Sequence, residues 1–91
     1  MNLRAEALGR FRQAVEPVFA ACQRWGLTPL VMYVDHNLLI DVFGNAEARQ
    51  AYGLPVKALP LEYGWDHLVR VECDREHSVT LDASGRIERL A

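Results

Sequence analysis

One stretch, 30–43, constrains the fold more than any other part of the chain. Two apolar runs, 30–34 and 38–43, flank three polar residues, Asp35, His36 and Asn37. Both runs are rich in β-branched and aromatic side chains and are apolar at consecutive positions, which is typical of strands covered on both faces. Because Asn37 tolerates the left-handed conformation and Asp35 can accept backbone hydrogen bonds, a tight turn fits between the runs. The stretch therefore predicts a β-hairpin at the centre of a sheet.

The segment 3–25 predicts an amphipathic helix. Its apolar residues recur at steps of three and four, which places them on one stripe: Leu8, Phe11, Val15, Val18, Phe19, Cys22 and Trp25. Pro17 cannot donate a backbone hydrogen bond and its ring crowds the preceding turn, so we expect the helix to kink or restart there. Gly26 supplies a C-terminal stop.

The middle of the chain, 44–64, carries weaker signals. Asn45 can cap a short helix over 46–52, which a glycine ends. Two prolines and a glycine in 54–64 argue against a long regular element. We expect this second segment to be a loop whose apolar side chains pack down as a lid on the core.

The last third of the chain alternates with a period of two. Apolar and polar residues alternate over 65–73 and again over 77–82, which predicts two half-buried strands. A three-residue turn between them would place two pairs in register, Cys73 with His77 and Val71 with Val79. The charged segment 86–90 predicts a short strand at the edge of the sheet.

The predicted order is helix, strand, strand, short helix, loop and three strands. Sequential hairpins favour antiparallel pairing, so we expect one α+β domain over 1–91, with the N-terminal helix packed on a mostly antiparallel sheet of about five strands. Its buried core should include Leu39, Ile40, Val71 and Val79. The same order of elements occurs in profilin-like architectures, which include the roadblock and PAS domains.

The segment 35–55 resembles the PAS pattern of an acidic turn, a second strand, an Asn-x-Ala motif and an aromatic-Gly-Leu motif. The matching residues are Asn45, Ala46, Ala48, Tyr52, Gly53 and Leu54. The resemblance is confined to this segment, and the middle helices of PAS domains have no predicted counterpart in 55–64. A roadblock domain would need a longer central helix than 46–52. We therefore do not assign the chain to either family.

Composition excludes several classes of function. Ten basic residues against twelve acidic ones leave a formal net charge of −2, so we expect no nucleic-acid partner. No apolar run is long enough to cross a membrane, and charged residues interrupt the N-terminal segment, so we expect a cytoplasmic protein with no membrane partner. Two cysteines are too few for a disulfide framework, and free cysteines usually serve as small buried apolar residues.

Three residues form the most specific candidate for a metal site. Strand periodicity places His67, Cys73 and His77 on one face, and cysteine and histidine are zinc ligands. However, Cys73 lies six positions after His67, which is roughly 20 Å along an extended strand. We therefore expect structural roles for these residues, and no metal or other cofactor.

Two acidic residues of the stretch 30–43 offer candidate chemistry. Asp35 lies next to His36, an acid beside an imidazole, but turn polarity explains both residues without catalysis. Asp41 interrupts an apolar run, and a charge in a central strand must be paired or face a cleft or solvent. We expect a structural ion pair between Asp41 and Arg70 from a neighbouring strand.

Candidate binding residues lie in the second half of the chain. Tyr63 and Trp65 flank a glycine in the expected loop, where an aromatic ring can stay partly exposed. The C-terminal third is acidic, and its Glu72 and Glu76 are candidates for an interface.

These patterns favour a protein-binding or regulatory module without catalytic activity, which binds a second copy of itself, a larger protein, or both. The chain has no glycine-rich phosphate loop and no nucleophile motif. The alternative is a small-molecule sensor whose pocket lies under the loop 54–63. A small enzyme or a zinc-binding protein is a weaker hypothesis.

Overall fold

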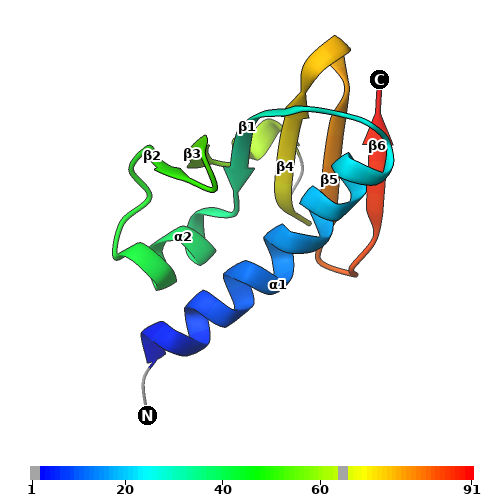
Figure 1. Cartoon of the computed structure of the whole chain (residues 1–91). Coiled ribbons are helices and arrows are strands. Elements are labelled where there is room, and N and C mark those ends of the chain that lie inside the picture. Colours follow the sequence, from blue (N-terminus) through cyan, green and yellow to red (C-terminus); the bar gives the residue numbers. More distant parts are fainter. Residues whose placement is uncertain (1–2, 64–65) are drawn as a thin grey trace.

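Two helices cover one face of a six-stranded sheet in the computed structural model, which describes residues 3–63 and 66–91 (Figure 1). The elements in chain order are α1 (Leu3–Arg24), β1 (Pro29–Val34), α2 (His36–Phe43), β2 (Arg49–Ala51), β3 (Leu54–Ala58), the 3-10 turn η1 (Leu61–Tyr63), β4 (His67–Cys73), the 3-10 turn η2 (Asp74–Glu76), β5 (Ser78–Asp82) and β6 (Ile87–Leu90). The predicted α+β class, with an N-terminal helix on a mostly antiparallel sheet, is confirmed.

The strands lie in the order β2-β3-β1-β4-β5-β6. β1 and β3 are parallel, and the other four pairings of the described strands are antiparallel. The sheet has six strands instead of about five because 49–51 and 54–58, predicted as helix and loop, both pair as strands. The parallel pair requires a crossover connection, which α2 and β2 provide.

The predicted hairpin over 30–43 is wrong, because its second half is α2. The Asp35 carboxylate accepts a hydrogen bond from the Leu38 amide at 3.1 Å and so caps the first turn of this helix. Gly44 ends it with φ +83° and donates its amide to the Ile40 carbonyl. A short apolar run does not distinguish a buried strand from a buried helix, and here helical spacing buries Leu39 and Val42.

The predicted helix over 46–52 is also wrong. The Asn45 side chain accepts a hydrogen bond from the Glu47 amide. The Arg49 guanidinium donates hydrogen bonds to the backbone carbonyls of Asn45 and Glu47, and also to the Asn45 side chain. These local contacts hold the backbone in a non-helical conformation. Tyr52 and Gly53, with φ of +55° and +74°, form the tight turn from β2 to β3.

Helix α1 runs through Pro17 as one element, so the predicted restart does not occur. Its predicted apolar stripe is confirmed: Phe11, Val15, Val18 and Cys22 are buried, and Leu8, Phe19 and Trp25 pack partly buried against them. Gly26, at φ +67°, ends the helix as predicted, with hydrogen bonds from Gly26 to Gln23 and from Leu27 to Cys22.

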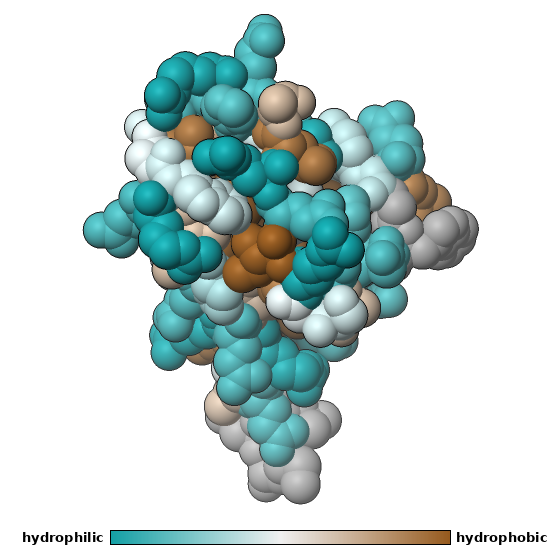
Figure 2. Space-filling view, turned by 90° about the vertical axis from the view of Figure 1, so that its right-hand side faces the viewer, coloured by the Kyte–Doolittle hydropathy of each residue, from teal (hydrophilic) through white to brown (hydrophobic). Residues whose placement is uncertain are grey.

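The C-terminal strands follow the sequence prediction. Val71 pairs with Val79, and the Cys73 amide donates to the His77 carbonyl at 2.8 Å, as the alternation predicted. β6 lies at the edge, and its flanking and internal charges protect it from further strand pairing. Figure 2, which views the molecule from the side where β6 lies in Figure 1, shows mainly hydrophilic side chains with small, separate hydrophobic patches.

The core lies between the helices and the inner face of the sheet. Met32, Val34, Val71 and Val79 are buried there, and Leu39 of α2 joins them. Ile40, also predicted to be buried, is 39% exposed, because the helical turn directs it away from the core.

The burial of Leu39 and the exposure of Ile40 distinguish the helix from the predicted hairpin. Leu39→Ala should lower the free energy of unfolding by about 2 to 5 kcal/mol, because it leaves a cavity in the core. Ile40→Ala is the matched control and should cost less than half as much. Urea denaturation measures both changes. Equal losses in the two variants would contradict the helical assignment.

Candidate functional site

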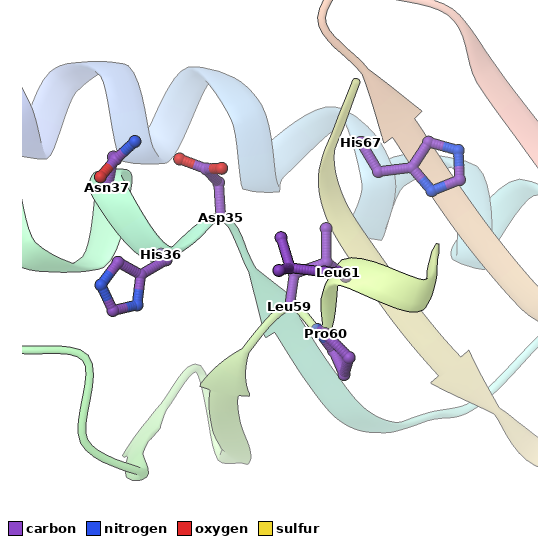
Figure 3. A pocket seen from close by; sticks show the side chains of 7 residues that line it. All are labelled: Asp35, His36, Asn37, Leu59, Pro60, Leu61 and His67. Carbon is purple, nitrogen blue, oxygen red and sulfur yellow. The ribbon is translucent and has the colours of Figure 1, made fainter. Parts of the chain in front are cut away.

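A cavity of about 480 Å³ lies at the carboxyl ends of β1 and β3. Asp35, His36 and Asn37 enter it from the end of β1 and the first turn of α2. Leu59, Pro60 and Leu61 follow β3, and His67 begins β4 (Figure 3). Ligand sites in open sheets typically lie past the carboxyl ends of parallel strands, where the connections diverge.

Backbone hydrogen bonds hold the cavity walls in place. The Leu59 amide donates to the Val34 carbonyl at 2.8 Å, which fixes the end of β3 beside the end of β1. The Asp35 amide donates to the Leu68 carbonyl at 2.8 Å, which fixes the start of α2 beside β4. The cavity is therefore bounded by segments that the sheet itself positions.

The polar groups of the cavity come from Asp35, His36, Asn37 and His67. Asp35 caps α2 with its carboxylate, and Figure 3 shows the imidazole of His36 directed away from that carboxylate. No hydrogen bond between Asp35 and either imidazole is present among the described residues. The Nδ1 atom of His67 is buried and has no hydrogen-bond partner in the described part of the chain. The predicted acid and imidazole pair is thus a helix cap beside an exposed histidine.

The cavity also has an apolar wall. Leu59, Pro60 and Leu61 supply it, and Leu61 is 71% exposed at the surface. These residues belong to the segment 54–63, which was predicted as a lid over a pocket. Its first part is strand β3, and only its end lines the cavity.

The predicted metal candidates are not brought together. His67 lies at the cavity and Cys73 at the far end of β4, where its Sγ contacts that of Cys22 at 3.7 Å. A register shift between His67 and Val69 also breaks the strict alternation on which the prediction relied. His77 follows η2, and the described residues contain no group of three metal-ligating side chains.

The second face of the sheet, away from α1 and α2, holds a cluster around Arg70 (Figure 1). The Arg70 guanidinium lies 4.2 Å from the centre of the Tyr63 ring and donates to the Ser78 hydroxyl at 3.3 Å. Tyr33 pairs with Arg70 across the strands, and its ring centre is 6.1 Å from that of Tyr63. Glu72 lies 3.5 Å from the Arg70 Nε. We call these residues, Tyr33, Tyr63, Arg70, Glu72 and Ser78, the open-face cluster.

One other predicted contact is corrected. Asp41 lies on α2 and pairs with Arg10 at 3.4 Å, so its predicted pair with Arg70 is wrong. Glu76, a candidate for an interface, is exposed in η2. Trp65 lies outside the described residues.

The sequence predicts a pocket under the segment 54–63 as an alternative, but not that Asp35, His36 and His67 line it, because it does not predict the parallel pair. Asp35 and His36 were recognised as a polar interruption, but a hairpin would have left them in an ordinary turn. The signal that identifies the site is an Asp between a strand and a helical apolar run, since aspartate is a preferred N-cap. The alternation of β4 gave no indication that His67 would meet these residues.

Comparisons of the chain with protein-family models, with curated proteins and with solved structures found no match. None of the described helices has an apolar stretch long enough to cross a membrane.

Proposed function

We propose that this protein is a small regulatory domain of the cytoplasm that binds a small molecule in the cavity at the carboxyl ends of β1 and β3. The observation that carries the proposal is the cavity itself, about 480 Å³ in volume and lined by three separate segments. This volume lies within the range of small-molecule sites. Binding in such a place involves both the helix α2 and the turn η1, so a ligand alters two elements at once.

The lining favours a ligand with an apolar body and a hydrogen-bonding group. The apolar body contacts Leu59, Pro60 and Leu61, while Asn37 and the two histidines offer hydrogen bonds at the opposite wall. The Asp35 carboxylate already accepts the Leu38 amide as a helix cap, so Asp35 contributes mainly to the position of α2 at the cavity.

The test is native mass spectrometry of the purified full chain after incubation with the low-molecular-mass fraction of a cell extract. We expect one bound molecule per chain. Leu61→Arg should reduce the bound fraction at least tenfold, because the longer side chain occupies the mouth of the cavity.

Leu30→Arg is the matched control, since Leu30 is 51% exposed and lies at the opposite end of β1. It should bind as the parent does. Equal binding by all three proteins, or the mass of the bare chain alone, would overturn the proposal.

The open-face cluster supports a second candidate, a homodimer formed face to face through the side of the sheet away from α1 and α2. Tyrosine and arginine are enriched at the energetic centres of interfaces. Strand pairing aligns Lys57, Tyr33, Arg70, Thr80 and Glu88 across the sheet, with the basic residues on one side and Glu88 on the other. A two-fold axis through such a row places the basic side of one copy over the acidic side of the other.

Light scattering at high micromolar concentration tests this candidate. We expect a dimer mass that falls toward the monomer at high salt or with Glu88→Arg, because each change weakens the charge pairing. Glu16→Arg, on the exposed side of α1, is the control and should stay dimeric. A monomer mass for the parent would rule the dimer out.

A further inference from the structure

Two buried cysteines from distant parts of the chain lie in contact. Cys22, near the end of α1, and Cys73, the last residue of β4, are 51 positions apart and place their sulfur atoms 3.7 Å from each other. Both are free thiols, 1% and 5% exposed respectively. The separation is a van der Waals contact, and a disulfide would shorten it to about 2.05 Å.

The pair lies at a corner where two connections meet, the segment 25–28 after α1 and the turn η2. The Asp74 amide and carboxylate bind the backbone of Thr28, at 3.0 and 2.8 Å. The Arg75 guanidinium donates to the Gly26 carbonyl at 2.8 Å. These contacts tie the turn η2 to the end of α1, and so hold the two sulfur atoms together in the folded chain.

The same corner carries backbone strain and is held by exposed contacts. Arg75 and Glu76 both adopt positive φ, +57° and +60°, which is unfavourable for residues with a side chain. The contacts of Arg75 and Asp74 that restrain them are exposed to solvent, where competing water weakens them. Opening of η2 exposes Cys73, which directly precedes it, before Cys22.

We propose that Cys22 and Cys73 form a redox-sensitive modification site, at which a low-molecular-mass disulfide such as oxidised glutathione closes an intramolecular disulfide. Cys73 attacks one sulfur of oxidised glutathione, forming a mixed disulfide and releasing one reduced glutathione. Cys22 then attacks the Cys73 sulfur, which forms the intramolecular bond and releases the second reduced glutathione. Two protein thiols are oxidised and one glutathione disulfide is reduced, so electrons and protons balance.

Burial keeps the pair in the thiol form at rest. It raises the pKa of the Cys22 thiol to about 12 and also raises the pKa of Cys73. The first step therefore depends on local opening, and we expect it to be slow at neutral pH and faster at alkaline pH, where thiolate forms more readily. Once closed, the bond links α1 to β4 across 51 positions, and cross-links over long segments restrict the unfolded chain most.

To test this, the reduced full chain is treated with oxidised glutathione. The protein is then unfolded, any free thiol is alkylated, and the intact mass is measured. We expect a monomer two hydrogen atoms lighter than the reduced chain, with no glutathione and no alkyl group attached. Non-reducing peptide mapping should join the peptides that contain positions 22 and 73. The oxidised chain should melt at a higher temperature than the reduced one, and dithiothreitol should reverse both changes.

Cys22→Ala is the control and should stop at a mixed disulfide on Cys73 without ever losing two hydrogen atoms. A parent chain that keeps two alkylatable thiols, accumulates the mixed disulfide or forms intermolecular dimers would overturn the proposal. The peptide map of the parent chain decides the question even if the variant does not fold.

Discussion

The hydrogen bond from the Leu38 amide to the Asp35 carboxylate decides where β1 ends and where α2 begins. The cap favours a helical start for the apolar run after Asp35, and the packing of Leu39 and Val42 on the core stabilises the same helix. The chain then turns away from the sheet, passes through α2 and returns as β3 parallel to β1. The cavity exists because the two parallel strands end side by side, so the topology and the candidate site both depend on this helix start.

The parts of the fold predicted from sequence are those with strict periodicity over many residues. The stripe of α1 and the alternation of β4 and β5 each repeat several times, and their register follows from keeping the apolar sets together. The stretch 38–43 is too short for its period to be read, and its apolar content suits a buried strand and a buried helix equally well. Tertiary contacts resolve it, because helical spacing packs Leu39 and Val42 on the core.

The errors at the candidate site share a cause. A hairpin makes Asp35 a turn residue and places Asp41 in a strand, next to Arg70. The helix instead turns Asp41 toward α1, where Arg10 lies, and leaves Arg70 to pair with Glu72 and to stack on Tyr63. Parallel pairing of β1 with β3 is a contact between distant segments, and no local pattern in 54–58 indicates it.

The central claim is the parallel pairing of β1 with β3, and nuclear Overhauser contacts between backbone protons of the full chain test it most directly. The structure predicts contacts in the register Met32 with Val56, Tyr33 with Lys57 and Val34 with Ala58, together with helical contacts between residues three and four apart within 36–43. Antiparallel contacts between 30–34 and 38–43, with none to 56–58, would restore the hairpin and remove the cavity on which the proposed function depends.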